Sequence, residues 1–240
     1  MKHKALAMHT VELVPIDSLE QLQPLVDIGC QAWLHDPIFT WLSPHRTESP
    51  RTYRNLWELI LKSDLSQPGT VIIAAYRDLH GPSQECLGFA VWRRHGSSPA
   101  AQQWRSDSFR MGMLRLEILL LHILQILSGR LPLKKAVNLQ TAKREVERLY
   151  PAERWRLCWL GVSPESQRCG IGSMLLQWGL ARSEEESVPV VLEASKSGRQ
   201  LYLDQGFEQV GWQRFDGGRI KQPVMIRHAR PPRKSHHMEL

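Results

Sequence analysis

The chain has 240 residues, enough for one domain with elaborations or for two small domains. Apolar residues make up 42% of it and charged residues 23%, which excludes a disordered, collagen-like or membrane-embedded class. The net charge of +7 is local, because residues 129–156 carry net +5 and residues 227–240 carry net +3. Basic patches of this kind suit polyanions, but no homeodomain-like, RRM or zinc-finger pattern accompanies them. The sequence therefore does not favour nucleic acid as a partner.

Other compositional signals concern location and metals. The four cysteines lie far apart with no C-x-x-C pair, so we expect a reducing compartment, no disulfide framework and no metal site. No apolar run or small-residue cleavage site follows Met1–Lys4, so we expect a cytoplasmic protein. The most apolar stretch, residues 111–127, contains Arg115 and Glu117 and is too short and too charged to cross a bilayer. No membrane association is expected.

Helical periodicity and proline positions predict a helix over 19–41 with a turn at Asp36–Pro37, and a second helix over 52–65. Strand-like runs over 70–76 and 86–92, joined by a turn at Gly81–Pro82, predict an antiparallel hairpin. Residues 97–150 are predicted to be a helical insertion. Its apolar residues with helical spacing predict a helix face buried in the protein rather than one lying on a membrane: Met113, Leu116, Leu120, Ile123, Leu124 and Leu127.

The last third of the sequence alternates between strands and helices. Strands are predicted over 155–162, 189–194, 207–212 and 222–227, with helices over 170–186 and 198–205. Strand, helix, strand after a hairpin predicts an α/β fold with a mixed sheet and at least one parallel pair. We expect a single domain over 1–228 that contains the insertion, followed by a basic flexible tail over 229–240.

The segment from Leu160 to Ser173 lies between a predicted strand and a predicted helix, where unpaired N–H groups and the helix dipole attract an anion. Gly170 and Gly172 remove Cβ atoms that would keep a phosphate away, so pyrophosphate is the expected ligand. A Rossmann fingerprint fails because Leu175 occupies the third glycine position, and Gly-Lys-Ser/Thr of a P-loop is absent. A serine-hydrolase elbow fails because Glu165 stands in place of its last glycine.

Two motifs carry a family resemblance. Val162-x-Pro-Glu followed by Gln-Arg-x-Gly-Ile-Gly-Ser173 resembles the Gln/Arg-x-x-Gly-x-Gly/Ala motif of the GNAT superfamily of acetyl-CoA-dependent N-acyltransferases. Leu201-Tyr202-x-x-x-Gly-Phe207 is similar to a second segment of that family. The resemblance covers residues 155–227 closely, and it implies a mostly antiparallel mixed sheet with a splayed central parallel pair flanked by helices. It implies an N-acetyltransferase that uses acetyl-CoA as co-substrate. The Leu-Glu-Ala-Ser195 strand also resembles the puromycin-acetyltransferase-like small-molecule branch seen in fungi.

The resemblance also assigns roles to residues. It implies that the backbone around Leu160 and Val162 contacts the pantetheine arm and the acetyl carbonyl, that Ser195 contacts CoA, and that Tyr202 is the general acid. The pyrophosphate would be held by the residues of one loop: Gln167, Arg168, Cys169, Gly170, Ile171, Gly172 and Ser173. The acceptor amine would be held by side chains of the first two helices: Trp33, Asp36, Phe39 and Trp41.

Several alternatives remain open from the sequence. The strand over 155–162 contains no carboxylate, so the candidate general base is Glu193, which is either a catalytic residue or a paired structural carboxylate. The four aromatic and acidic acceptor-side residues either line a pocket or complete the core. Cys169 as a covalent nucleophile is a less favoured reading than direct transfer. The missing carboxylate also fits a catalytically degenerate CoA-binding or protein-interaction module, and a monomer or a homodimer is expected.

Overall fold

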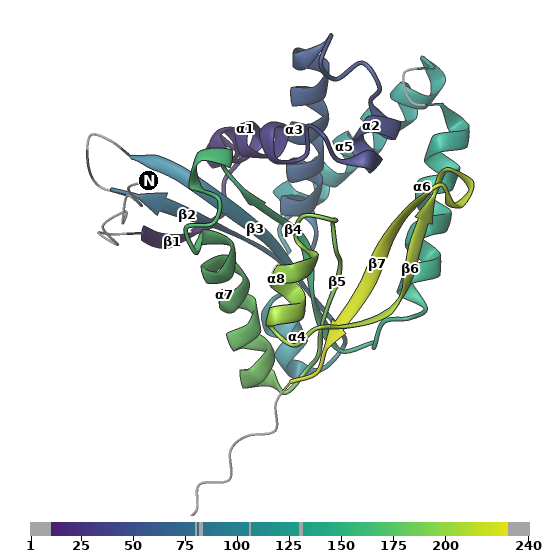
Figure 1. The fold of residues 1–240 in the computed structure, drawn as a ribbon. Helices are drawn as coiled ribbons and strands as arrows, with labels where there is room; N and C mark the ends of the chain where they lie inside the picture. The colour runs from purple at the N-terminus through teal and green to yellow at the C-terminus, as the bar shows by residue number, and fades with distance from the viewer. Residues whose placement is uncertain (1–10, 80, 82–83, 106, 130–131, 230–240) are drawn as a thin grey trace, which may run out of the picture.

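The computed structural model describes residues 11–79, 81, 84–105, 107–129 and 132–229 of the chain, with the elements labelled in Figure 1. The strands are β1 (Val11–Ile16), β2 (Thr70–Arg77), β3 (Glu85–His95), β4 (Arg154–Val162), β5 (Val190–Glu193), β6 (Glu208–Phe215) and β7 (Ile220–Arg227). The α-helices are α1 (Gln23–Ala32), α2 (Pro37–Leu42), α3 (Pro50–Ser66), α4 (Pro99–Gln103), α5 (Phe109–Leu127), α6 (Leu133–Glu147), α7 (Ile171–Glu186) and α8 (Arg199–Asp204). Short 3₁₀ turns lie at η1 (Glu20–Leu22), η2 (Pro164–Ser166) and η3 (Asp216–Gly218).

The strands of the described residues form one sheet in the order β1-β2-β3-β4-β5-β7-β6. Its neighbouring strands are antiparallel except for β4 and β5, which run parallel. This confirms the predicted α/β class and the mixed, mostly antiparallel sheet. The prediction lacked β1, whose segment Val11–Ile16 pairs with β2 as the edge strand. Pro15 is tolerated there because an edge strand leaves one side without a ladder.

Helices cover both faces of the sheet, as Figure 1 shows with α1 and α3 on one face and α7 on the other. Side chains alternate between the two faces along each strand. Ile73 and Ala75 of β2 pack in the cluster that contains the apolar residues of α7, whereas Ile72 and Ala74 pack with those of α1 and α3. Because both faces of the sheet are covered, side chains on either side of a central strand are buried. The central strands are therefore nearly continuous apolar runs.

The segment predicted as a helical insertion forms α4, α5 and α6 between β3 and β4. One prediction for it is wrong: the apolar residues expected on a buried face of α5 are exposed, from Ile123 at 43% to Leu127 at 78%. The side of α5 that is buried carries Leu114 and Ile118, which pack against Leu59 of α3. Periodicity identified an apolar face of this helix, but the protein core contacts its other side.

Two further predictions concern the chain outside the described residues. The turn at Gly81–Pro82 includes Pro82, and the tail over 229–240 is described only at residue 229. Within the part of the chain that the structure covers, none of the helices combines the length and the apolar character needed to span a membrane.

Candidate functional site

Strands β4 and β5 diverge in the middle of the sheet. They pair only through three partners, from Trp155↔Val190 to Leu157↔Leu192. Strand β4 continues to Val162, where it still pairs with Gly88 of β3. Within the described residues, 158–162 therefore have no strand partner on the β5 side. Apart from the Val162 carbonyl, which accepts from the Gln167 side chain, the backbone polar groups at this edge are open to an extended ligand. The splayed parallel pair implied by the family resemblance is present.

The chain turns from the end of β4 into α7 through the loop 163–170. Arg168 and Gly170 both have left-handed backbone conformations, with φ of +59° and +84°. Gly170 is the N-cap of α7 and provides no side chain to cap the helix. Among the described residues, the first N–H groups of α7 consequently have no capping partner, and the positive end of the helix dipole adds to their attraction for an anion.

Glycine occupies positions 170 and 172 for different reasons. At Gly170 a Cβ atom would meet no atom within 4 Å, so the positive φ alone explains glycine there. At Gly172 no positive φ is present, and a Cβ would lie 3.6 Å from Leu201 and 3.7 Å from Val162, which is ordinary contact. Nothing in the folded protein therefore requires glycine at position 172. An absent Cβ in the first turn of α7 suits a ligand that approaches the backbone closely.

The remaining residues of the loop divide into exposed and anchoring ones. Gln167, Arg168 and Cys169 are exposed, and the Gln167 side chain donates to the Val162 carbonyl over 3.3 Å. Ile171 is 4% exposed and packs in the core cluster beneath α7. Its side chain thus anchors the helix while its backbone N–H remains at the uncapped end. Leu160 and Val162 pack against the same cluster.

Tyr202 and Ser195 lie after β5, on the other side of the divergence. The Tyr202 ring is 7% exposed and meets Phe207 edge-on, with ring centroids 5.8 Å apart. Burial raises the pKa of Tyr202 above its ordinary value, so the phenol holds its proton at neutral pH. The Ser195 hydroxyl accepts the Gly198 N–H over 3.1 Å. Its hydroxyl and that of Tyr202 both lie within 3.5 Å of the position a Cβ would take at Gly198, which shows that the two side chains converge.

Glu193, at the end of β5, is held in an ion pair. Its Oε1 accepts from the Arg156 guanidinium at 2.6 Å, and the carboxylate side chain is 9% exposed. The Arg156 guanidinium also lies over the Tyr150 ring, 5.6 Å from its centroid. The sequence left open whether Glu193 is a catalytic residue or a paired structural carboxylate. Arg156 is the partner that the second alternative requires.

The acceptor-side residues do not gather at one point. Trp33 and Phe39 share an aromatic cluster with Trp57 and Trp159, with ring centroids 4.7–6.1 Å apart. A Cβ at Gly161 would come within 2.7 Å of the Trp33 ring, so the cluster lies directly on the diverging part of β4. The face of β4 opposite α7 is therefore aromatic at the divergence.

Asp36 and Trp41 have other contacts. The Asp36 carboxylate caps α2 by accepting the Ile38 N–H at 2.8 Å, and burial raises the pKa of this carboxyl. Trp41 faces Phe215, with centroids 6.3 Å apart, and its carbonyl accepts from Lys135 at 2.6 Å. These contacts connect the end of α2 to α6 and β6 rather than to the aromatic cluster.

Three residues of this region were not predicted from the sequence. Trp57 of α3 and Trp159 of β4 complete the aromatic cluster, and Asp64 of α3 accepts from the Trp159 indole N–H at 2.8 Å. Trp159 stands in the strand preceding the glycine loop, which is the one sequence signal for it. Within the described residues, no three His, Cys, Asp or Glu side chains come together as a metal ion would require.

Comparison with known proteins agrees with this geometry. Residues 146–225 match the family described as the acetyltransferase (GNAT) domain. An acetyltransferase from Stachybotrys chartarum is 23% identical over 187 residues, which cover 78% of this chain and 76% of that protein.

Solved structures share the fold. The structure described as histone acetyltransferase HPA2 and related acetyltransferase from Corynebacterium glutamicum aligns with a TM-score of 0.58 at 20% identity, covering 93% of this chain and 99% of that one. PH1933 from Pyrococcus horikoshii aligns with a TM-score of 0.53 at 14% identity, covering 92% and 100%. The segment that matches the acetyltransferase (GNAT) domain contains the divergent strands, the glycine loop and α8, and the chain shares the fold of these solved structures.

Proposed function

We propose that this chain transfers the acetyl group of acetyl-CoA directly to a primary amine of a small molecule. The observation that carries the proposal is the uncapped first turn of α7, which opens beside the unpaired end of β4. A phosphate-bearing thioester that lies along this edge meets N–H donors at one end and free strand backbone at the other.

The loop residues bind the pyrophosphate through their backbone. Positions 170–173 present the N–H groups of the helix start, and Gly172 leaves the space that close approach needs. Arg168 is exposed at the turn and adds positive charge near this anion. The β4 backbone around Leu160 and Val162 orients the pantetheine arm, and Ser195 contacts CoA from the β5 side.

Acetyl-CoA supplies an activated acyl group as a thioester. Transfer forms a nitrogen–carbon bond and breaks the carbon–sulfur bond, so the amine loses one proton and the leaving thiolate takes one. Tyr202 is the proton donor in this proposal, because its buried phenol is protonated at neutral pH and its hydroxyl points toward the Ser195 and Gly198 turn after β5. Glu193 would accept the amine proton only by leaving its pair with Arg156.

The acceptor approaches from the face of β4 opposite α7. Trp33 is partly buried there and provides a ring face, to which amines bind both by apolar contact and, when protonated, by cation–π attraction. Phe39 is 3% exposed and packs in the core beneath it, so the core alternative holds for this residue and its part in the acceptor site is indirect. Asp36 holds the start of α2 in place by capping it. Trp41, near the end of α2, extends the acceptor surface toward Lys135.

A second candidate function is a CoA-binding or protein-interaction module without catalysis. It is favoured by the absence of any carboxylate from Arg154 to Val162 and by the commitment of Glu193 to Arg156. The two candidates share the glycine loop and differ in turnover.

Calorimetry and a thiol-release assay distinguish these functions. Acetyl-CoA should bind the wild-type protein, and Gly172→Glu should reduce the affinity by about tenfold or more because it adds a side chain and a negative charge where phosphate is expected. Gly112→Glu is the matched control, since a Cβ at this helical glycine would contact only the end of Arg115, at 3.7 Å. Amine-dependent release of CoA thiol supports the enzyme, and tight binding without release from any of a broad panel of amines supports the module. Equal affinity of wild-type and Gly172→Glu protein would refute the binding site for both.

A further inference from the structure

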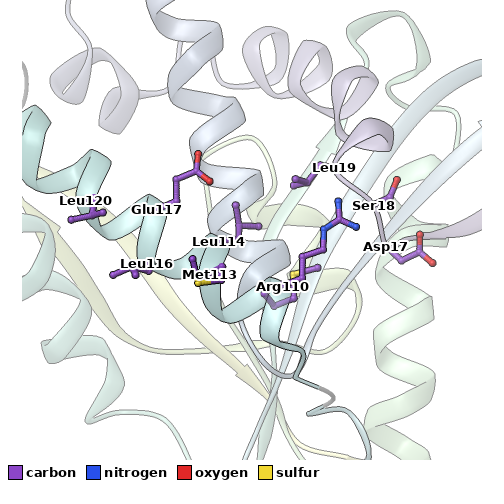
Figure 2. A pocket seen from close by; sticks show the side chains of 10 residues that line it. Asp17, Ser18, Leu19, Arg110, Met113, Leu114, Leu116, Glu117 and Leu120 are labelled. Carbon is purple, nitrogen blue, oxygen red and sulfur yellow. The ribbon is translucent and has the colours of Figure 1, made fainter.

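Helix α5 presents a second apolar face to solvent. The large apolar residues on this face are between 43% and 85% exposed, with Phe109 and Leu127 the most exposed at its two ends. Figure 2 shows Met113, Leu116 and Leu120 in sequence along the first part of this helix. Single exposed apolar side chains are ordinary on a protein surface and need no explanation. A continuous row of them, by contrast, marks an interaction surface.

The spacing of this row is that of a helix–helix seam. The exposed residues follow one another at intervals of four, three, four, three and four: Phe109, Met113, Leu116, Leu120, Ile123 and Leu127. Alternation of three and four is the heptad pattern in which two helices interlock their side chains. In a two-fold contact both copies use the same surface, so one such row is enough to form both sides of the seam.

The opposite side of α5 is already occupied. Leu114 and Ile118 pack against Leu59 of α3, and at about 100° per residue they lie on the far side of the helix from the row. The Arg115 guanidinium donates to the Ser66 carbonyl at 2.6 Å and to Asp107 at 2.6 Å, which further fixes the rotation of the helix. The row therefore cannot turn into the core of its own chain without breaking these contacts.

The exposed area matches what a stable pair needs. From the exposed fractions, the row with Leu119 and Leu124 of the same helix leaves on the order of 1,000 Å² in solvent, more than the largest patch of a typical monomer. Each partner in a stable complex buries about 800 Å². Beside the row, Met113, Leu116 and Leu120 also line a groove of about 390 Å³ whose other wall is Asp17–Leu19, and side chains of an approaching helix would fill it (Figure 2).

We propose that two copies of this chain form a homodimer in which α5 of one copy packs along α5 of the other. The charged residues that flank the row on one side are Arg110 and Glu117, whose charges cancel. An anionic membrane would be attracted by a net positive charge, so a protein partner is favoured. Four basic residues of the insertion, Lys134, Lys135, Lys143 and Arg144, lie instead on α6, where the Lys135 ammonium donates to the carbonyl of Trp41.

Sedimentation velocity of the full chain tests this proposal. The wild-type protein should sediment at twice the chain mass of 27.6 kDa at micromolar concentration, and Leu116→Lys with Leu120→Lys should sediment as a monomer. Lysine is a good helix former, so these variants keep α5 helical. Leu121→Lys is the matched control: the same substitution on the same helix, at a residue 41% exposed but about 120° around from the row, should leave the dimer intact.

Circular dichroism checks that each variant is folded. Flotation with phosphatidylcholine vesicles, with and without phosphatidylserine, tests whether a membrane rather than a second copy covers the row. A wild-type chain that is monomeric at 100 µM, a dimer that persists in the double variant, or a wild-type monomer that floats with vesicles while the double variant does not would each overturn the proposal. If the double variant is unfolded, Met113→Lys and Ile123→Lys apply the same test at other positions of the row. Loss of the dimer in these two variants, with Leu121→Lys still dimeric, supports the proposal.

Discussion

Substitutions at the two glycines of the α7 loop should have opposite effects on stability and on ligand affinity. Gly170 has φ of +84° and open space around a Cβ, whereas Gly172 has ordinary helical backbone with Leu201 and Val162 at contact distance. The folded protein therefore requires glycine at the first position, and only the proposed CoA phosphate requires a small, uncharged residue at the second. A comparison of Gly170→Ala with Gly172→Glu separates these two requirements.

The magnitudes follow from the geometry. Gly170→Ala forces an L-residue into the left-handed region, which costs about 1–2 kcal/mol, or roughly 2–8 °C in melting temperature for a domain of this size. Gly172→Glu should leave stability unchanged or raise it by up to about 1 kcal/mol, because glutamate has less backbone freedom to lose on folding and its charge suits the first turn of a helix. Its carboxylate would stand where a phosphate of CoA is expected, so CoA affinity should fall about tenfold or more, which corresponds to about 1.4 kcal/mol or more of binding free energy.

Two measurements on the same samples test this. Thermal unfolding without ligand reports the stability of each variant, and calorimetric titration with CoA reports its affinity. The expected pattern is a less stable Gly170→Ala and a weakly binding, fully stable Gly172→Glu. A Gly172→Glu protein that binds CoA as tightly as wild type would show that no phosphate approaches the backbone at this position, and the loop would no longer be the proposed binding site.

Further predictions concern the chemical step, the acid range and the core. Tyr202→Phe keeps the ring and deletes the donor, so kcat should fall roughly 10²- to 10⁴-fold with CoA affinity unchanged; a near-wild-type kcat when chemistry limits the rate would exclude the acid role. Hydrogen bonds from Ser98 lower the pKa of Glu153 from 4.5 to about 2, so its stabilisation is present above pH 4.5 and is lost as pH falls toward 2. Unfolding free energy measured across this range should depend less on pH in Glu153→Gln, and equal pH dependence would contradict the assignment. Gly179→Ala places a Cβ 2.3 Å from the Trp92 ring and should lower the unfolding free energy by about 1–3 kcal/mol, whereas an unchanged denaturation midpoint would mean that the ring moves without cost.

The parts of the site that could be predicted from the sequence are those whose physics is local. The segment from Gln167 to Ser173 is a strand-to-helix turn, and its glycines, its missing cap and its helix start are all properties of adjacent residues. The α/β order of the last third follows in the same way from short-range periodicity. Boundaries differ by a few residues, as at β6, which extends to Phe215 because it pairs with β7 as far as Ile220.

The parts that depend on tertiary neighbours could not be predicted in this way. Trp33, Asp36, Phe39 and Trp41 lie within nine residues of one another, yet the contacts of Trp41 are with α6 and β6 and those of Trp33 are with α3 and β4. A helix end and a turn between these residues send their side chains in different directions. The pairing of Glu193 with Arg156 likewise depends on the register of β4 and β5, which no local pattern specifies.

The neighbours of helix α5 could not be predicted from its sequence pattern either. A periodic pattern tells which residues share a face of a helix, but it does not tell whether that face meets the helix's own domain. Here Leu114 and Ile118 form the face that packs on α3, and the stronger periodic row lies opposite them. A helix that is apolar on two opposite sides is stable in water when both sides are covered, and the described fold covers one. The spacing of the other side, alternating three and four, is that of a helix whose second partner is another helix.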